Sequence, residues 1–204
     1  VGVTPVLELI SAQFNFPLVV KPSQGGSALG VTIVNEASQL PGAMVDCYAY
    51  GEQARIEEYV VGREVAVSVV DISGEPGALP PVEINIDGLY DYDARYNPGR
   101  AEYFVPARLD DDELAAVKDV AERAHSILGL RHLSRTDVIV QDDGTVMLLD
   151  INVAPGTTET SLFPQAATAE AAARGVDADE IYIEILQAAL RDAGETDDKA
   201  VAGA

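Results

Sequence analysis

The clearest structural signal in the chain lies in residues 134–152, which read SRTDVIVQ-DDG-TVMLLDIN. Two apolar-rich runs, 134–141 and 145–152, flank the short sequence DDG at 142–144. An Asp-Gly pair between two such runs is the strongest short-range indication of a β-hairpin. The stretch therefore predicts an antiparallel hairpin, and the rest of the chain is interpreted outward from it.

Polar side chains on this predicted hairpin gather on one face. Arg135 and Asp137 lie two residues apart, so their side chains point to the same side of a strand, and Asp150 and Asn152 do the same. Counting outward from the turn brings Asp137 opposite Asp150. Carboxylates with an amide oxygen suit Mg²⁺, a hard cation that prefers oxygen ligands. An ordinary cross-strand ion pair on a solvated face fits the spacing equally well.

Apolar residues surround these charges in the sequence. VIV at 138–140 and MLL at 147–149 are apolar on both faces of their strands. This pattern predicts a sheet that is covered on both sides. An unpaired charge is costly there, so the polar group is expected to be paired or to hold a ligand.

Short strands, loops and helices fill the remainder of the chain. The predicted strands are residues 16–22, 31–34, 54–60, 62–70 and 82–86, and the first two are spaced for a hairpin. The predicted helices run from Asn35 or Ser38 to about Ala49, over 110–128, and near 177–192 ahead of an acidic tail. Loops are predicted at 24–30, 74–81 and 88–108, and a loop as long as the last is usually functional or mobile.

A lysine and a glycine-rich loop follow the first predicted strand. Lys21 offers a point charge, and the loop QGGSALG at 24–30 exposes backbone amides that suit phosphate groups. No Lys-Ser or Lys-Thr pair follows the glycines, so this is not a Walker loop. A glycine-rich hairpin loop without a ligand explains the same residues.

Two further groups of residues have the chemistry of a nucleotide or carboxylate site. Glu57 and Glu64 flank Gly62 and have the acceptors for an adenine amino group and a ribose hydroxyl, although exposed strand glutamates look the same. In APGTTETSL at 154–162, Gly156 can present a backbone amide to an oxyanion and Ser161 can bind a carboxylate at a helix start. A polar loop capped by Thr160 or Ser161 is the alternative.

The composition of the chain excludes several classes of partner and setting. The chain has 204 residues and a net charge of −21, which argues against nucleic acids and anionic membranes as partners. A single cysteine, Cys47, favours a reducing, cytoplasmic setting and is expected to be a small core residue. No run is long and apolar enough to span a bilayer, and His125 and His132 lack metal-like spacing.

Taken in order, the motifs resemble the ATP-grasp part of the D-alanine–D-alanine ligases over about residues 4–192. The matching stretches are FPLVVKP (16–22) with GGSALG (25–30), IEEYVVGRE (56–64), YDYDARY (90–96), SRTDVIV (134–140), LLDINVAPG (148–156) and TETSLFP (158–164). The resemblance implies an α+β fold in which two subdomains with mainly antiparallel sheets grip ATP between them. The implied divisions are a central subdomain at 1–63, a C-terminal subdomain at 64–192 and an acidic tail at 193–204.

The resemblance also implies roles for individual residues. It assigns phosphate contacts to Lys21 and the loop with Ser27, adenine contacts to Glu57 and the backbone near Val60, and the ribose to Glu64. It assigns Mg²⁺, which Mn²⁺ can replace, to Asp137, Asp150 and Asn152. Arg135 and the Gly156 amide would stabilise the tetrahedral intermediate, and Ser161 with Leu162 would hold the carboxylate of the second D-alanine. Arg95 and Tyr96 would lie in a mobile loop that closes on Ser27, and Tyr96 favours D-alanine over D-lactate.

The implied reaction needs no nucleophilic side chain. ATP phosphorylates one D-alanine carboxylate, the amine of a second D-alanine attacks the acyl phosphate, and phosphate leaves, for peptidoglycan precursor synthesis. Catalysis of this kind depends on positioning and charge neutralisation. Four departures from the family pattern bear on it: Asp150 for a glutamate, Ala28 for a serine, Arg95 for a lysine and Glu58 for a lysine.

The family also has an N-terminal domain that contributes to the first substrate site and to ATP binding. We expect this chain to lack it and to be inactive alone, with homodimers formed by the full-length protein. Two alternatives stay open. One is an ATP-grasp ligase that joins another carboxylate to another amine, and the other is a non-catalytic ATP-binding regulatory module.

Overall fold

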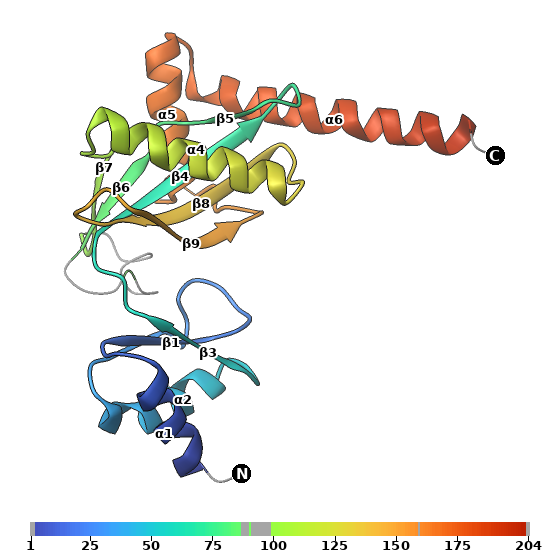
Figure 1. The fold of residues 1–204 in the computed structure, drawn as a ribbon. Helices are drawn as coiled ribbons and strands as arrows, with labels where there is room; N and C mark the ends of the chain where they lie inside the picture. The colour runs from blue at the N-terminus through green and yellow to red at the C-terminus, as the bar shows by residue number, and fades with distance from the viewer. Residues whose placement is uncertain (1–2, 87–89, 91–98, 159, 203–204) are drawn as a thin grey trace. The chain divides into compact units, whose positions relative to one another are not determined.

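A computed structural model describes residues 3–86, 90, 99–158 and 160–202 (Figure 1). The chain forms two compact units, one of Val1–Val61 with Ile86–Ala101 and the other of Gly62–Asn85 with Glu102–Ala204. The predicted subdomain boundary between residues 63 and 64 stays a prediction, because a compact unit is not necessarily a domain that folds alone.

The first unit is a small sheet with helices packed on it. Its elements are α1 (Val3–Gln13), β1 (Leu18–Pro22), β2 (Thr32–Val34), the 3₁₀ turn η1 (Ala37–Gln39), α2 (Leu40–Tyr48) and β3 (Ala54–Glu58). β1 lies in the middle and pairs antiparallel with both neighbours, which confirms the predicted hairpin of the first two strands. Leu18, Val20 and Leu40 form its core with Cys47, whose thiol pKa is raised by burial.

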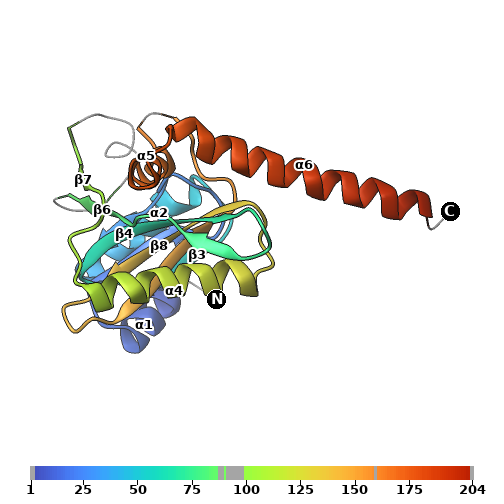
Figure 2. The same cartoon turned by 90° about the horizontal axis from the view of Figure 1, so that it is seen from above.

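The second unit is built on a larger sheet with the strand order β7-β6-β4-β8-β9, and β5 pairs with β4. Its strands are β4 (Arg63–Asp71), β5 (Pro76–Ala78), β6 (Val82–Asn85), β7 (Glu102–Phe104), β8 (Leu133–Val140) and β9 (Val146–Asn152). Its helices are α4 (Asp111–Ile127), α5 (Leu162–Arg174) and α6 (Ala178–Ala202). Figure 2 shows α4 on one face of this sheet and α5 on the other.

A capping box at its start and a buried stripe along one side explain where α4 begins and how it packs. Asp110 caps the helix by accepting a hydrogen bond from the Glu113 amide, while the Glu113 side chain accepts from the Asp110 amide. Val117, Ala121 and His125 form a buried stripe along the helix, and it packs on the valines of β4 and β8. This apolar layer covers one face of the sheet with α4.

Several predicted boundaries differ from the structure. α1 at residues 3–13 has no counterpart among the predicted elements, and β5 and β7 fall inside stretches predicted as loops. α2 begins at Leu40 after the η1 turn, and α6 continues to Ala202 through the predicted acidic tail. Short edge strands such as β5 and β7 are paired by tertiary contacts rather than by local propensity, so periodicity does not reveal them.

The prediction of a covered sheet at residues 147–149 is wrong. Met147, Leu148 and Leu149 are 41%, 49% and 39% exposed. The reason is that β9 lies at the edge of the sheet, whereas β8 lies inside it and has Val138 and Val140 fully buried. Charges on β8 are therefore enclosed, and those on β9 are open to solvent.

Candidate functional site

The β8–β9 hairpin has the predicted register. Arg135 pairs with Asn152 and Asp137 with Asp150, with a bulge after Asp137. Gly144 closes the turn at a φ of +82°, and the Thr145 amide donates to the Asp143 carboxylate. The four polar residues that the sequence placed on one face are therefore cross-strand neighbours.

Arg135 and Asp137 form a buried ion pair on that face. Arg135 Nε donates to Asp137 Oδ1 at 2.7 Å, and Nη2 donates to Oδ2 at 2.9 Å. Asn152 Nδ2 adds a third donor to the same carboxylate at 3.2 Å. Arg135 is 7% exposed and Asp137 is 4% exposed, so both charges are removed from water and depend on each other.

Asp150 completes the group from the open side. It is exposed, and its Oδ1 accepts from the Ile151 amide at 2.9 Å. Among the described residues, no group of three or more His, Cys, Asp or Glu side chains is arranged to hold a metal ion. The hairpin offers two carboxylates and one amide, whose nitrogen donates to Asp137 and whose oxygen is the atom that could bind a cation.

Glu64 belongs to the same face of the second unit. On β4, Ala66 pairs with Asp137 and Ser68 pairs with Arg135, and Glu64 is two residues before Ala66. Alternate residues of a strand share a face, so Glu64 lies on the side of the sheet that carries the Arg135–Asp137 pair.

The loop after β9 is organised around Ser161. The Thr158 and Ser161 hydroxyls lie 2.8 Å apart, and a Cβ built on Gly156 would lie 2.7 Å from Ser161 Oγ. A side chain at position 156 would therefore displace the Ser161 hydroxyl from this position. Ser161 precedes α5, but its side chain makes no capping bond among the described residues, and the buried Leu162 begins the helix.

Lys21 and Glu57 contact each other in the first unit. Lys21 Nζ lies 2.7 Å from Glu57 Oε2 across the antiparallel β1–β3 pair. The family resemblance assigns Lys21 to the phosphates of ATP and Glu57 to the adenine, whereas here the two side chains form an ion pair, with Arg55 3.7 Å from Glu57. Val60 follows the end of β3 at Glu58 and is half-buried.

The glycine-rich loop has an unusual backbone. Ser27 and Ala28 have φ values of +56° and +55°, a region that residues with a side chain rarely occupy. Gly30 has a φ of +71°, and a Cβ there would lie 2.7 Å from Tyr50 and 3.0 Å from Pro22. Such strain gathers at functional loops. The predicted site residues Arg95 and Tyr96 lie outside the described residues.

A second ion pair, which the sequence pattern did not predict, joins the buried Glu83 to the exposed Arg108. Arg108 Nη2 donates to Glu83 Oε1 at 2.7 Å, and Arg108 Nε and its amide donate to Oε2. These bonds hold the pKa of the Glu83 carboxyl below its usual range. The signal was a glutamate inside the apolar strand VEINI, because a charge at a buried strand position needs a partner.

Arg63 extends this second pair. It donates to the Arg108 carbonyl oxygen at 2.7 Å and forms an ion pair with Glu113 at the start of α4. The Arg108 guanidinium also lies over the Phe104 ring. These contacts join β4, β6, β7 and α4 and are structural.

The architecture is that of the ATP-grasp ligases. A D-alanine–D-alanine ligase from Bacillus anthracis superposes with a TM-score of 0.71 at 27% identity, over 93% of this chain and 58% of that one. The VanG D-Ala:D-Ser ligase from Enterococcus faecalis has a TM-score of 0.75 at 24% identity, over 91% of this chain and 53% of that one. These likenesses confirm the predicted α+β fold class.

Residues 4–197 match the family described as the D-ala D-ala ligase C-terminus. The chain therefore belongs to the D-alanine–D-alanine ligase family. A D-alanine–D-alanine ligase of Halalkalibacterium halodurans is 42% identical over 160 residues, which is 76% of this chain and 52% of that protein. The chain thus spans about half the length of the curated relatives it matches.

Within the described residues, no helix combines the length and apolarity that crossing a membrane requires.

Proposed function

We propose that the protein carrying this chain is an ATP- and Mg²⁺-dependent ligase that joins two D-alanines for peptidoglycan precursors. The observation that carries the proposal is the buried Arg135–Asp137 pair facing Asp150 on the β8–β9 hairpin. The guanidinium can stabilise an anionic reacting group, and the two carboxylates next to it can bind the cation that accompanies ATP. Membership of the ligase family supports the same conclusion.

The donor set suits Mg²⁺. Asp137, Asp150 and Asn152 supply the oxygen ligands that a small hard cation prefers, with phosphate and water completing its coordination. The bound cation, or Mn²⁺ in its place, would neutralise phosphate charge in a protein of net charge −21. In the first unit, Lys21 and the loop with Ser27 would bind phosphates, and Glu57 and the Val60 backbone would bind adenine.

The remaining residues would act on the amino acids and the ribose. Glu64 would accept from the ribose hydroxyls. Arg135 and the Gly156 amide would stabilise negative charge on the carbonyl oxygen as the second amine attacks the acyl phosphate. Ser161 and Leu162 would position the second carboxylate at the start of α5, where backbone amides attract anions. Arg95 and Tyr96 would close the site over Ser27.

Phosphate release tests the activity. The full-length protein with ATP and Mg²⁺ is expected to release phosphate when D-alanine is added and to form the D-alanyl dipeptide. L-alanine serves as the matched control and should release none. If no D-amino acid stimulates phosphate release, the proposal is wrong. We expect the isolated chain to be inactive, and the full-length protein to be cytoplasmic and to form homodimers.

The exposure of Asp150 favours a second candidate, a non-catalytic module that binds ATP for regulation. Asp150 is one methylene shorter than the glutamate usual in the family, and it bonds its own strand. Such a module would bind ATP and release no phosphate with any amino acid. A ligase acting on another carboxylate or amine would release phosphate with a substrate other than D-alanine.

A further inference from the structure

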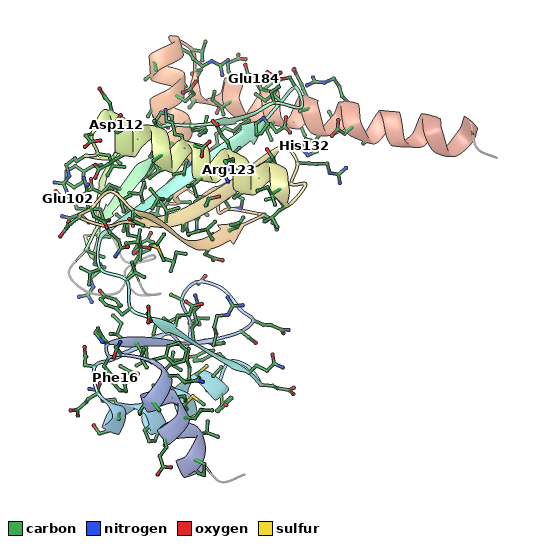
Figure 3. The ribbon with its side chains drawn as sticks, in the orientation of Figure 1. Phe16, Glu102, Asp112, Arg123, His132 and Glu184 are labelled. Carbon is green, nitrogen blue, oxygen red and sulfur yellow. The ribbon has the colours of Figure 1, made fainter. Side chains whose placement is uncertain are left out.

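A polar cavity of about 290 Å³ lies in the second unit. It is bordered by the β4–β5 turn, by the connector between α4 and β8, and by α6. Figure 3 shows His132 of this connector beside α6, with Arg123 further back along α4. Its polar lining residues are Asp71, Ser73, Arg131, His132, Arg191 and Asp192. None of them belongs to the proposed ligase site.

Hydrogen bonds join the three segments around the cavity. His132 Nε2 lies 2.9 Å from Asp192 Oδ2 on α6, and Arg191 Nη2 donates to the Ile72 carbonyl oxygen at 2.8 Å. The Asp71 amide donates to the His132 carbonyl oxygen at 3.0 Å, and Asp71 Oδ1 accepts from the Gly74 amide at 2.7 Å. The walls are therefore held by defined contacts from elements far apart in the sequence.

Substantial hydrogen-bonding capacity remains after these contacts. Arg131 is exposed, and its side chain makes no hydrogen bond or ion pair within the described part of the chain. Arg191 has five N–H donors, of which one binds Ile72. Asp71 Oδ1 accepts a single backbone amide, although a carboxylate accepts several donors. The cavity can thus both donate to and accept from a ligand.

The balance of charge selects the kind of ligand. Arg131 and Arg191 oppose Asp71 and Asp192, so the fixed charges cancel although the chain carries −21. A simple anion would face two carboxylates, and a simple cation would face two guanidinium groups. A molecule with one carboxylate and one ammonium group meets a partner for each.

We propose that this cavity binds a small zwitterion about the size of a dipeptide. The volume lies near the lower end of the range of roughly 300–1,000 Å³ that small-molecule sites occupy, which suits a ligand of that size. Arg131 and Arg191 receive the carboxylate, and Asp71 receives the ammonium group. The inference does not depend on the proposed ligase activity, because it uses different residues.

Proton NMR of the histidines tests the site directly. The chain has two histidines, and the buried His125, bonded to Ser134, does not line the cavity and serves as an internal reference. Titration with glycylglycine should shift the His132 imidazole signal saturably and shift that of His125 far less. Acetylglycylglycine, which lacks the ammonium group, and glycylglycinamide, which lacks the carboxylate, should each bind at least tenfold more weakly.

A matched pair of variants locates the binding. Arg131→Gln should weaken glycylglycine binding roughly tenfold through the loss of a charged hydrogen bond. Arg123→Gln removes the same charge from an exposed position on α4 and should leave the affinity for glycylglycine unchanged. The proposal is overturned if glycylglycine gives no saturable His132 shift, if either analogue or phosphate binds as tightly, or if Arg131→Gln has no effect.

Discussion

Arg135 and Asp137 show what single residues determine in this protein. Two opposite charges at alternate positions of one interior strand are each less than a tenth exposed. Each makes the burial of the other tolerable, and together they aim a guanidinium and a carboxylate at the same face. The same residues that carry the proposed chemistry are therefore a source of structural vulnerability.

Arg135→Met should destabilise the second unit. It leaves the Asp137 carboxylate buried with a single remaining donor, Asn152, at 3.2 Å. Breaking a buried ion pair on one side costs about 3–5 kcal/mol. Urea denaturation should therefore show a free energy of unfolding lower by about 3 kcal/mol. Arg123→Met, at an exposed position, is the control, and an equal loss in both variants would contradict the account.

Ala28→Gly should stabilise the protein. Ala28 has a φ of +55°, and a left-handed conformation costs a residue with a Cβ about 1–2 kcal/mol. Thermal or urea unfolding should show a gain of about 1 kcal/mol, after the loss of chain entropy that glycine brings. Gly30→Ala should have the opposite effect, because its Cβ would meet Tyr50 and Pro22. A neutral or destabilising Ala28→Gly would mean that the loop is not strained.

Individual elements are positioned by a few polar contacts at their ends. The Asp110–Glu113 capping box begins α4, and Arg63 reaches from β4 to Glu113 in the same turn. Next to it, Arg108 joins the β7 side of the sheet to Glu83 on β6. These contacts hold together the strands on either side of residues 86–101.

The Glu83–Arg108 pair should make stability depend on acid. The pKa of Glu83 is lower in the folded state than its ordinary value of 4.5, chiefly because Arg108 donates to it. The pair therefore contributes its full stabilisation above pH 4.5, and this is lost as the pH falls below 4.5 through the folded pKa. Unfolding free energies measured from pH 7 to pH 3 should fall less steeply for Glu83→Gln than for the unchanged protein.

Glu102→Gln provides the control for this pH dependence. Glu102 is an exposed residue on β7 that accepts from Asn85. The variant should follow the pH profile of the unchanged protein. If Glu83→Gln gives the same steep profile as the other two proteins, another carboxyl group causes the acid sensitivity.

Elements that depend on a local sequence pattern could be predicted from the sequence. The Asp-Gly turn at 143–144 correctly predicted the β8–β9 register, and the acidic start at 110–113 correctly predicted α4. The sequence could not reveal that β9 is an edge strand, because sheet order depends on pairings between distant segments. The Lys21–Glu57 contact was missed for the same reason, since it needs β1 and β3 to be neighbours.

At the scale of the whole molecule, a strongly acidic chain is proposed to bind an anionic nucleotide. The chain has thirteen lysines and arginines but thirty-four acidic residues, so long-range electrostatic attraction cannot assist the binding of ATP. ATP binding is instead proposed to depend on a few cations at defined positions, Lys21 and Arg135 among them, and on Mg²⁺ bound by acidic residues. The roles of individual site residues remain predictions, because they follow from family resemblance and not from sequence periodicity.

Calorimetric titration of ATP with and without Mg²⁺ shows whether the β8–β9 hairpin binds the cation together with the nucleotide. For the unchanged chain, Mg²⁺ should tighten ATP binding. Asp150→Asn should abolish this gain while leaving stability unchanged, because Asp150 is exposed. Asp142→Asn, an exposed carboxylate in the turn of the same hairpin, should keep the gain. An undiminished Mg²⁺ effect in Asp150→Asn would contradict the account.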